Sequence, residues 1–582
     1  MKDLVRKEVL LNAYLHNGKA NVGSVMKKLM GNYPELREQS KEIMELVKQL
    51  VNEINQKNLE EITNILEKDY PDAIKNAETS KKEKKQQRKE LPPLPKAEKG
   101  KVVLRYAPDP SKYPHIGHAL NYMINELYRE KYSGKAVLRF DDTNPQKVAL
   151  EYYDAIKDGM QWVGCKWDKE VKASENLEHF YKLSEKLIKD GHFYVCTCRA
   201  EKIKEYREKM LECECRSRPI NENLEMFKQM TEGKYSPGSA VIRLKGNMKS
   251  KNSVMRDPVM FRIVNPKQYP HPIVGDKYWL WPTYDFETSV MEKDLGITHV
   301  LRSAEFGKMR VELQSYLIKL LGGEPPIFHQ YSRFNIIGAI TKGREIRELV
   351  EKGIVDGWDD IRLVTISGLR KRGIVPEVIK DLILEIGITA KNAKITWEKI
   401  VAFNRRHLDA TAPRLFAVLN PVPLEITNVS SREITLKYHP DNKKLGERTI
   451  KTSNEFYISK SDAEVLKQGE TFRLKDLYNV KIIEITNEKI IAKYQSDELI
   501  PKTKKIQWVS KEHALELDYT IPLPLINKDG TINKNSLVKV KGYVEDNIKG
   551  FEIGSLFQLE RIGFAKLNKM QEYVVYMHEI HK

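Results

Sequence analysis

KVVLRYAPDPSKYPHIGHALNY, residues 101–122, joins an apolar run to a helix-like pattern, and the fold of the chain's centre follows from it. Its first seven residues, KVVLRYA, have the length and apolar character of a buried strand. Apolar residues three and four apart from Leu120 to Tyr128 predict a helix that ends near Gly134. KAVLRF (135–140) predicts a second strand. A helix between two such strands is typical of a right-handed crossover, so we expect a parallel-sheet α/β domain.

The whole chain is too long for one core, because its 582 residues predict about four domains. Lys and Arg outnumber Asp and Glu by 99 to 81, a net charge of +18. This excess suits a polyanion such as nucleic acid, although a surface of paired Lys and Glu side chains would give the same composition. No apolar run is long enough for a signal peptide or a bilayer span. We therefore expect a cytoplasmic protein with no membrane partner.

Changes in sequence texture mark the domain boundaries. The first 78 residues are polar with helical apolar spacing, clearest from Ile43 to Ile54. From Lys81 to Lys101 there are nine basic residues against three acidic ones, which is typical of a linker. Beyond Pro413, short runs such as REITLKY and VKIIEI alternate with turns, which indicates one or two antiparallel barrels. We expect a multidomain α/β chain with a helical extension (1–80), a basic linker (81–100), two halves of the parallel-sheet domain (101–193 and 291–338) around an insertion (194–290), a helical segment (339–410) and a β region (411–582).

The turn between the first strand and its helix is a candidate phosphate site. Ligands bind at the carboxyl ends of parallel strands, where a helix N-terminus offers free N–H groups. Gly117 leaves room for a flat base, while His115 and His118 share one helix face and have N–H groups to donate. A metal site is disfavoured because no third ligand accompanies the pair at suitable spacing. From these residues alone, a capped turn with two satisfied histidines is the alternative.

The neighbouring motifs indicate a family. PHIGH after RYAPDPS, followed by VLRFDDTNP (137–145), resembles the signatures of class I aminoacyl-tRNA synthetases, and within them the archaeal-type glutamyl-tRNA synthetases. The resemblance runs from about residue 100 to the end, with GWDDIRLVTISGLRKRG and FQLERIGFAKL as further matches. It implies a Rossmann-like catalytic domain with an acceptor-binding insertion, a helical stem and anticodon-binding β-barrels. NAYLHNGKANVGSV resembles the amino-terminal extension of this family.

The resemblance also implies a reaction. Enzymes of this family activate an amino acid with ATP and Mg²⁺ and transfer it to the terminal ribose of tRNA. His115 and His118 would contact the triphosphate, and Gly117 would lie under the adenine. The family's mobile loop, typically KMSKS, is matched by AITKGR from Ala339 to Arg344, with Lys342 in place of the catalytic lysine. Lys112 stands where the family usually has Gly.

The expected amino acid is glutamate. Arg105 lies at a strand end and could clamp a carboxylate, although pairing with a nearby Asp is an alternative. Arg302 falls where glutamyl enzymes carry Arg and glutaminyl enzymes a small uncharged residue. An amide substrate would leave that cation unpaired, at a cost of roughly a few kcal/mol. The resemblance implies the following substrate-binding residues: Arg105, Ala107, Asp141, Tyr284 and Arg302.

Alternatives stay open at this stage. Asp141 and Asp142 could form a metal pair instead of binding the α-amino group. The degenerate AITKGR loop, and Phe306 in place of the usual His, also fit a catalytically weak tRNA-binding paralogue. A glutaminyl-tRNA synthetase is the other alternative. The expected partners are glutamate and tRNA(Glu); the sequence leaves open whether tRNA(Gln) is charged too.

The cysteines form two close pairs. CTC (196–198) and CEC (213–215) are separated by fourteen residues, and five cysteines in the whole chain exclude a disulfide framework. Cys196, Cys198, Cys213 and Cys215 would suit tetrahedral zinc, yet the spacing differs from the commoner Cys-x-x-Cys. Structural zinc and four free thiols are therefore evenly matched. Cys165 stands alone and is expected in the core.

Overall fold

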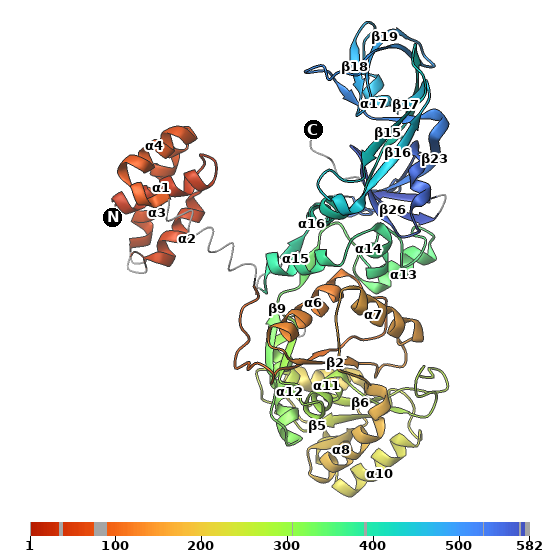
Figure 1. The fold of residues 1–582 in the computed structure, drawn as a ribbon. Helices are drawn as coiled ribbons and strands as arrows, with labels where there is room; N and C mark the ends of the chain where they lie inside the picture. The colour runs from red at the N-terminus through yellow and green to blue at the C-terminus, as the bar shows by residue number, and fades with distance from the viewer. Residues whose placement is uncertain are drawn as a thin grey trace. The chain divides into compact units, whose positions relative to one another are not determined.

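The computed structural model describes residues 2–33, 36, 39–74, 90–304, 307–388, 393–527, 529–569 and 572–576. The chain divides into two compact units, residues 1–91 and 92–582 (Figure 1). The described part of the first unit contains helices α1 (Lys2–Leu15), α2 (Val22–Asn32), α3 (Ser40–Ile54) and α4 (Leu59–Asp69). The α3 helix buries Ile43, Val47, Leu50, Val51 and Ile54, which confirms the predicted helical face.

The second unit begins inside the predicted linker. Leu94 is only 4% exposed, and its backbone N–H donates to the Tyr132 hydroxyl at 2.9 Å. The Tyr128 hydroxyl donates to the Pro92 carbonyl at 2.9 Å. Residues 92–100 thus pack on the helix that follows the first strand, whereas residues 81–89 of the predicted linker lie outside the described residues.

The predicted parallel sheet is confirmed. Strand β1 (Val103–Tyr106) pairs in parallel with β2 (Lys135–Phe140), and β2 with β3 (Lys169–Lys172). Helices α6 (Ile116–Lys131) and α7 (Leu150–Trp162) make the two crossovers. A second parallel pair, β8 (His299–Ser303) and β9 (Ile327–Tyr331), flanks α12 (Gly307–Leu320). It lies beside β1, because the Thr298 N–H donates to the Val103 carbonyl at 3.0 Å.

The insertion forms its own antiparallel sheet. Its strands are β4 (Phe193–Cys196), β5 (Val241–Leu244), β6 (Val259–Ile263) and β7 (Leu280–Pro282), which pair in chain order. Helices α9 (Ala200–Lys209) and α10 (Ile220–Thr231) belong to it, and α8 (Leu177–Lys189), which lies before the predicted boundary at residue 194, packs in the same core. Helix α11 (Tyr284–Asp294) then leads the chain back to the parallel sheet, and its buried Phe286 packs against Phe193 and Phe261 of the insertion.

A helical segment follows the parallel sheet. It contains α13 (Gly343–Glu351), α14 (Ile366–Arg372), α15 (Glu377–Ile386) and α16 (Trp397–Thr411), with β10 (Phe334–Ile336) paired to β11 (Ala393–Ile395). The backbone before α14 is bonded to the backbone before α6. The Ile116 N–H donates to the Val364 carbonyl at 2.8 Å, and the Ile366 N–H donates to the Pro114 carbonyl at 2.9 Å. The two helix starts therefore hold a fixed position relative to each other.

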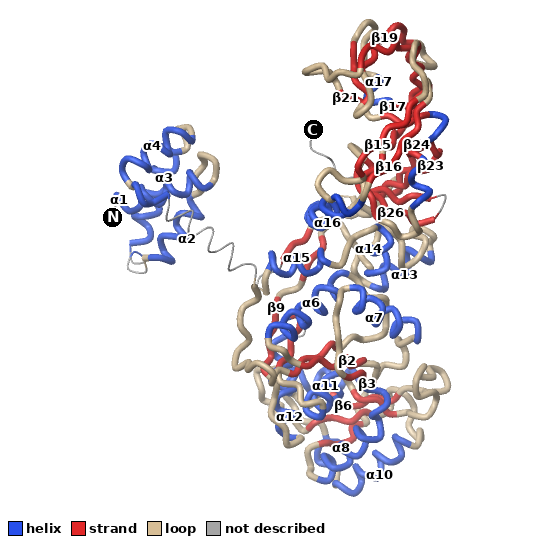
Figure 2. Tube along the Cα trace, in the orientation of Figure 1, coloured by secondary structure: helices blue, strands red, loops and turns tan. Residues whose placement is uncertain are grey.

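The C-terminal region contains two seven-stranded sheets (Figure 2). The first contains β12 (Arg414–Leu415), β13 (Ala417–Leu419), β23 (Ala514–Pro522), β24 (Leu537–Glu545), β25 (Leu556–Leu559), β26 (Gly563–Lys569) and β27 (Glu572–Tyr576). The second contains β14 (Pro421–Thr427), β17 (Glu455–Ser459), β18 (Thr471–Leu474), β19 (Asn479–Ile485), β20 (Ile490–Ser496), β21 (Lys505–Ile506) and β22 (Trp508–Ser510). A hairpin of β15 (Arg432–Lys437) and β16 (Glu447–Thr452) accompanies them.

Each of these sheets curls until its edges nearly meet. The edge strands of the first sheet, β12 and β13, are separated by Phe416, and those of the second, β21 and β22, by Gln507. One residue spans only about 3.5 Å, so the two edges of each sheet lie together, as in a barrel. The predicted antiparallel barrels are confirmed for most strand pairs. Four pairs are parallel instead: β12–β25 and β23–β27 in the first sheet, and β18–β21 and β14–β20 in the second.

The two barrels meet at Phe416, beside a buried ion pair between the β15–β16 hairpin and the first barrel. The Phe416 ring is 1% exposed and meets Trp508 of the second barrel edge-on, with centroids 5.5 Å apart. Its backbone N–H donates to Glu545 at 3.0 Å, and the Arg448 guanidinium donates to the same carboxylate at 2.6 Å. Arg448 and Glu545 are 1% and 2% exposed, so each depends on the other for its charge.

We predict that Glu545→Ala destabilises the C-terminal region by about 3–5 kcal/mol, because it leaves the Arg448 cation buried without its partner. Glu516→Ala is the matched control. It removes the exposed pair with Lys541 on the same sheet and should cost below about 1 kcal/mol. Calorimetric unfolding of the full chain measures both, and equal effects would contradict the assigned importance of the buried pair.

Candidate active site

The histidines of the PHIGH motif are arranged around the start of α6. His115 is the N-cap residue, and its Nδ1 accepts a hydrogen bond from the Gly117 N–H at 3.0 Å. The Nδ1 of His118 accepts from the His115 N–H at 3.1 Å, and the two ring centroids lie 4.0 Å apart. Because both Nδ1 atoms are acceptors, the proton of each neutral ring is on Nε2. The two rings therefore offer two Nε2–H donors.

Both histidines are neutral at physiological pH. Burial lowers the pKa of His115 to about 3, and the positive charges of Lys112 and Arg333 add to the effect. Burial also lowers the pKa of His118 well below its ordinary value. Gly117 allows the ring of His115 to fold over the helix start, since a Cβ there would lie 2.8 Å from His115 Cε1. This contact is a second reason for glycine, beside the space for a base that the sequence suggested.

The segment matched to the lysine loop lies against this turn. A Cβ placed on Gly343 would lie 3.1 Å from Cδ and 3.2 Å from Cβ of Lys112. Lys342 precedes it as the N-cap residue of α13, and its ammonium donates to Glu345 at 2.7 Å. The Lys342 side chain is 70% exposed. The structure thus brings the two predicted ATP motifs together, with Lys112 at their contact.

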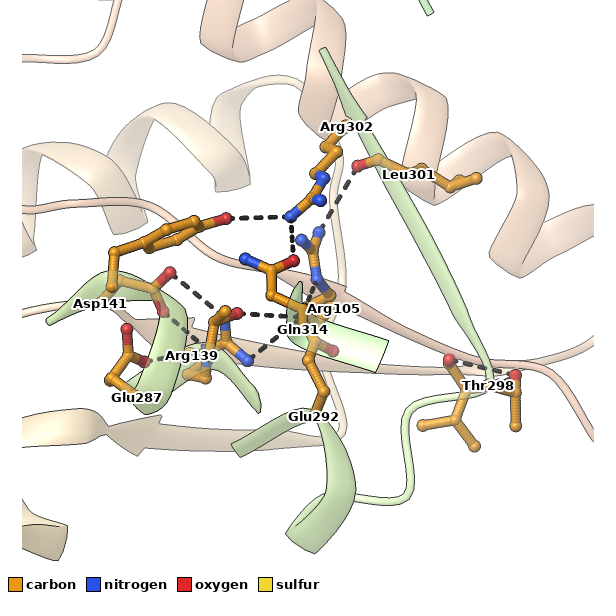
Figure 3. A network of polar contacts seen from close by, with 12 residues as sticks. Arg105, Arg139, Asp141, Glu287, Glu292, Thr298, Leu301, Arg302 and Gln314 are labelled. Atoms are coloured by element: carbon orange, nitrogen blue, oxygen red, sulfur yellow. Dashed lines mark hydrogen bonds and ion pairs between the residues drawn. The ribbon is translucent and has the colours of Figure 1, made fainter. Parts of the chain in front are cut away.

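Two of the predicted substrate residues are buried arginines on adjacent strands (Figure 3). Arg105 on β1 is 4% exposed, and its Nε donates to Glu292 Oε1 at 2.8 Å. Arg302 on β8 is 3% exposed, and its Nη1 donates to Gln314 at 2.8 Å and to the Tyr284 hydroxyl at 3.3 Å. Ala107 directly follows β1. The structure therefore brings Arg105, Arg302 and Tyr284 into one network.

Asp141 belongs to the same network through Arg139, which the sequence analysis did not single out. Arg139 is fully buried; its Nε donates to Asp141 at 2.6 Å and its Nη1 lies 3.3 Å from Glu292 Oε1. Asp142 points to other partners, since it accepts hydrogen bonds from Ser174 and Tyr153. The two aspartates therefore do not share one set of contacts, which argues against a metal pair. The sequence did contain a signal for Arg139, because a charged side chain inside the apolar run VLRF is expected to be buried and therefore to need buried partners.

Two glutamates on α11 also belong to this network. Burial, with the nearby Asp141 carboxylate, raises the pKa of Glu287 well above its ordinary value. Burial opposes ionisation of Glu292 as well, but Arg105 and Arg139 outweigh it and lower the pKa of Glu292. Within the described network of Figure 3, Arg105 and Arg139 thus pair with the carboxylates of Glu292 and Asp141, and Arg302 contacts Gln314.

The four cysteines of the insertion meet at one point. The sulfur atoms of Cys196, Cys198, Cys213 and Cys215 all lie within 4.8 Å of one another. The pairs Cys196–Cys213 and Cys198–Cys215 are each 3.9 Å apart. Arg243 is buried beside them, with Nη1 3.5 Å from the Cys213 sulfur. Cys165 is 4% exposed, as predicted for a core residue.

Two further predictions concern Phe306 and the absence of a membrane span. Phe306 lies outside the described residues. Among the helices that the structure describes, none is long and apolar enough to cross a membrane.

Comparison with known proteins shows the family of the chain. The catalytic-domain pattern of "tRNA synthetases class I (E and Q)" matches residues 101–410, and the family's two anti-codon binding domain patterns match residues 412–496 and 505–568. A glutamate–tRNA ligase of Pyrococcus furiosus is 38% identical over the full length of both chains. Ligases of the same name from Nitrosopumilus maritimus and Sulfolobus acidocaldarius are 38% and 35% identical, over 100% of this chain and 99% of each relative. The chain therefore belongs to the class I tRNA synthetases of the glutamyl and glutaminyl branch.

Proposed function

We propose that the chain joins glutamate to tRNA(Glu) in two steps, using ATP with Mg²⁺ to make glutamyl-adenylate first. Two buried guanidinium groups on neighbouring strands, those of Arg105 and Arg302, carry the choice of amino acid. Glutamate has two carboxylates and one ammonium, hence one net negative charge, whereas glutamine has none. Full-length similarity to glutamate–tRNA ligases supports the same assignment. A tRNA ligase works where translation takes place, which agrees with the cytoplasmic location expected from the sequence.

The arginines divide the work of binding glutamate. We assign the side-chain carboxylate to Arg105 and Arg302, with Tyr284 beside them and Ala107 at the strand end. Asp141, held by Arg139, receives the α-amino group. Glu292 orients Arg105 through its 2.8 Å contact. A glutamine side chain in this pocket would leave a buried cation without its anion, which costs about 1–3 kcal/mol or more.

Activation needs hydrogen-bond donors and cations more than a base. The substrate carboxylate attacks the α-phosphorus and pyrophosphate leaves, so negative charge builds up on the phosphates. The Nε2–H groups of His115 and His118 are the donors on the α6 side, with Gly117 under the adenine. Lys342 exchanges Glu345 for a phosphate when it acts. Mg²⁺ bound with the nucleotide would neutralise part of its charge.

The aminoacylation assay tests this function. We expect transfer of labelled glutamate, and not glutamine, to tRNA(Glu), with Arg302→Ala slowing glutamate activation by about 100-fold or more. Adding tRNA(Gln) to the same assay shows whether it is a second substrate. Transfer of glutamine alone would identify a glutaminyl enzyme, and tRNA binding without charging would identify an inactive paralogue.

The tautomers of the histidines give a second prediction. His118→Ala removes an Nε2–H donor and is expected to slow ATP–pyrophosphate exchange by about 10²–10³-fold. His118→Gln keeps an N–H near that position and should retain more activity. Because the histidine pKa values are lowered, neither ring changes charge between about pH 6 and pH 8. An inflection near pH 6.5 that His118→Gln abolishes would contradict this protonation state.

We further propose that the four cysteines hold structural zinc. Four sulfurs around a tetrahedral zinc ion lie about 3.8 Å apart, given Zn–S bonds of about 2.3 Å, and two pairs here are 3.9 Å apart. Arg243 would offset part of the negative charge of four thiolates. A zinc ion would link the two Cys-x-Cys segments of the insertion to each other.

Metal analysis of protein purified without chelators tests the zinc site. We expect about one zinc ion per chain, and loss of most of it in Cys213→Ser. Cys165→Ala, which alters a cysteine outside the cluster, serves as the control and is expected to keep its zinc. Wild-type protein with far less than one zinc ion per chain would show four free thiols instead.

A further inference from the structure

Lys112 occupies a rigid position between the two ATP motifs. Three residues C-terminal to it, His115 caps α6, and the bonds to Val364 and Ile366 fix that backbone. The next residue, Tyr113, packs against Trp358 at 5.1 Å between ring centroids, and its hydroxyl donates to Glu151 at 2.7 Å. The backbone on the C-terminal side of Lys112 is therefore held in place.

The stem of Lys112 runs across Gly343. A side chain at Gly343 would begin 3.1 Å from Cδ, 3.2 Å from Cβ and 3.7 Å from Cγ of Lys112. These distances are shorter than or near ordinary contact, so the lysine stem fits there because position 343 is glycine. Lys112 also acts on the histidines, since its charge contributes to the lowered pKa of both His115 and His118. The side chain thus lies between the histidine pair and the Lys342 segment.

Two of three departures from the family signatures, Lys112 and Gly343, meet at this contact, and the third, Ala339, lies four residues before Gly343. Relative to KMSKS, this chain has Ala339 at the first lysine and Gly343 at the last serine. Relative to the usual glycine of the turn, it has Lys112. Relative to the family signatures, the loop lacks one positive charge at Ala339 and one side chain at Gly343. The turn that contacts it carries an additional charged side chain, Lys112. A compensating exchange accounts for all three substitutions together. The positive charge that is absent at Ala339 is present at Lys112, and the glycine at position 343 leaves room for the lysine stem.

We propose that Lys112 binds the triphosphate of ATP and replaces the missing first lysine of the loop at Ala339. The inference rests on the proposed ATP-dependent activation and adds one residue to it. A lysine ammonium is a compact charge that suits phosphate oxygens without a fixed geometry. Being on a rigid turn, it is in place before the nucleotide binds, whereas a loop lysine must first be positioned.

Steady-state ATP–pyrophosphate exchange by the full chain tests the proposal. Lys112→Ala is expected to lower kcat/KM for ATP by about 10- to 100-fold, with KM for glutamate changed less than about twofold. Lys112→Arg keeps the charge and is expected to retain most activity. Lys135→Ala, at the opposite end of β2, is the control and should leave the rate unchanged.

A second variant decides whether Lys112 stands in for the loop lysine. Ala339→Lys is expected to restore at least tenfold in the Lys112→Ala background and to change the wild type little. Failure of this rescue would overturn the replacement, and an unchanged kcat/KM in Lys112→Ala would overturn phosphate binding. A wild-type chain with no exchange activity would instead overturn the proposed function itself. Equal thermal unfolding of the variants excludes loss of folding as the cause.

Discussion

The carboxylate of Glu292 holds two buried guanidinium groups on neighbouring strands, and the arrangement of the site depends on it. Its Oε1 lies 2.8 Å from Arg105 on β1 and 3.3 Å from Arg139 on β2. Buried cations repel each other and are stable only when paired, so this one anion sets the distance between the two strand ends. Glu292 comes from α11, the helix that leads out of the insertion. The insertion and the parallel sheet are thereby joined at the substrate pocket.

Much of the catalytic domain was predictable because its signals are local. The run–helix–run pattern of residues 101–140 predicts the parallel sheet, and the predicted helix is α6. The partners of the arginines were not predictable in the same way. Glu292 is 187 residues from Arg105 along the chain. The apolar pattern of helix α11 gives no sign that one of its glutamates pairs with arginines of the parallel sheet. Arg302 was found only because a family motif marks its position.

The same contrast applies at the ATP motifs and in the barrels. The sequence marks Lys112 as unusual but says nothing about Gly343, which is more than two hundred residues away and contacts it only in the fold. Short β runs predict barrels, but the closure at Phe416 and Gln507 depends on pairing between distant strands. Part of the predicted linker is packed instead, because Leu94 finds an apolar site beside Tyr132 that composition cannot reveal.

The strand order of the two barrels has a consequence for how the chain is made. All strands of the second barrel lie between β13 and β23 of the first, so the second barrel is nested within the first along the chain. During synthesis, all strands of the nested barrel have been made once Ser510 has been added, whereas the partners of β12 and β13, which are β25 and β24, follow only between Leu537 and Leu559. At that stage Trp508, the packing partner of Phe416, is already part of the chain, whereas the sheet that contains β12 and β13 is not yet complete. The chain order therefore allows the inner barrel to form before the outer one closes beside it.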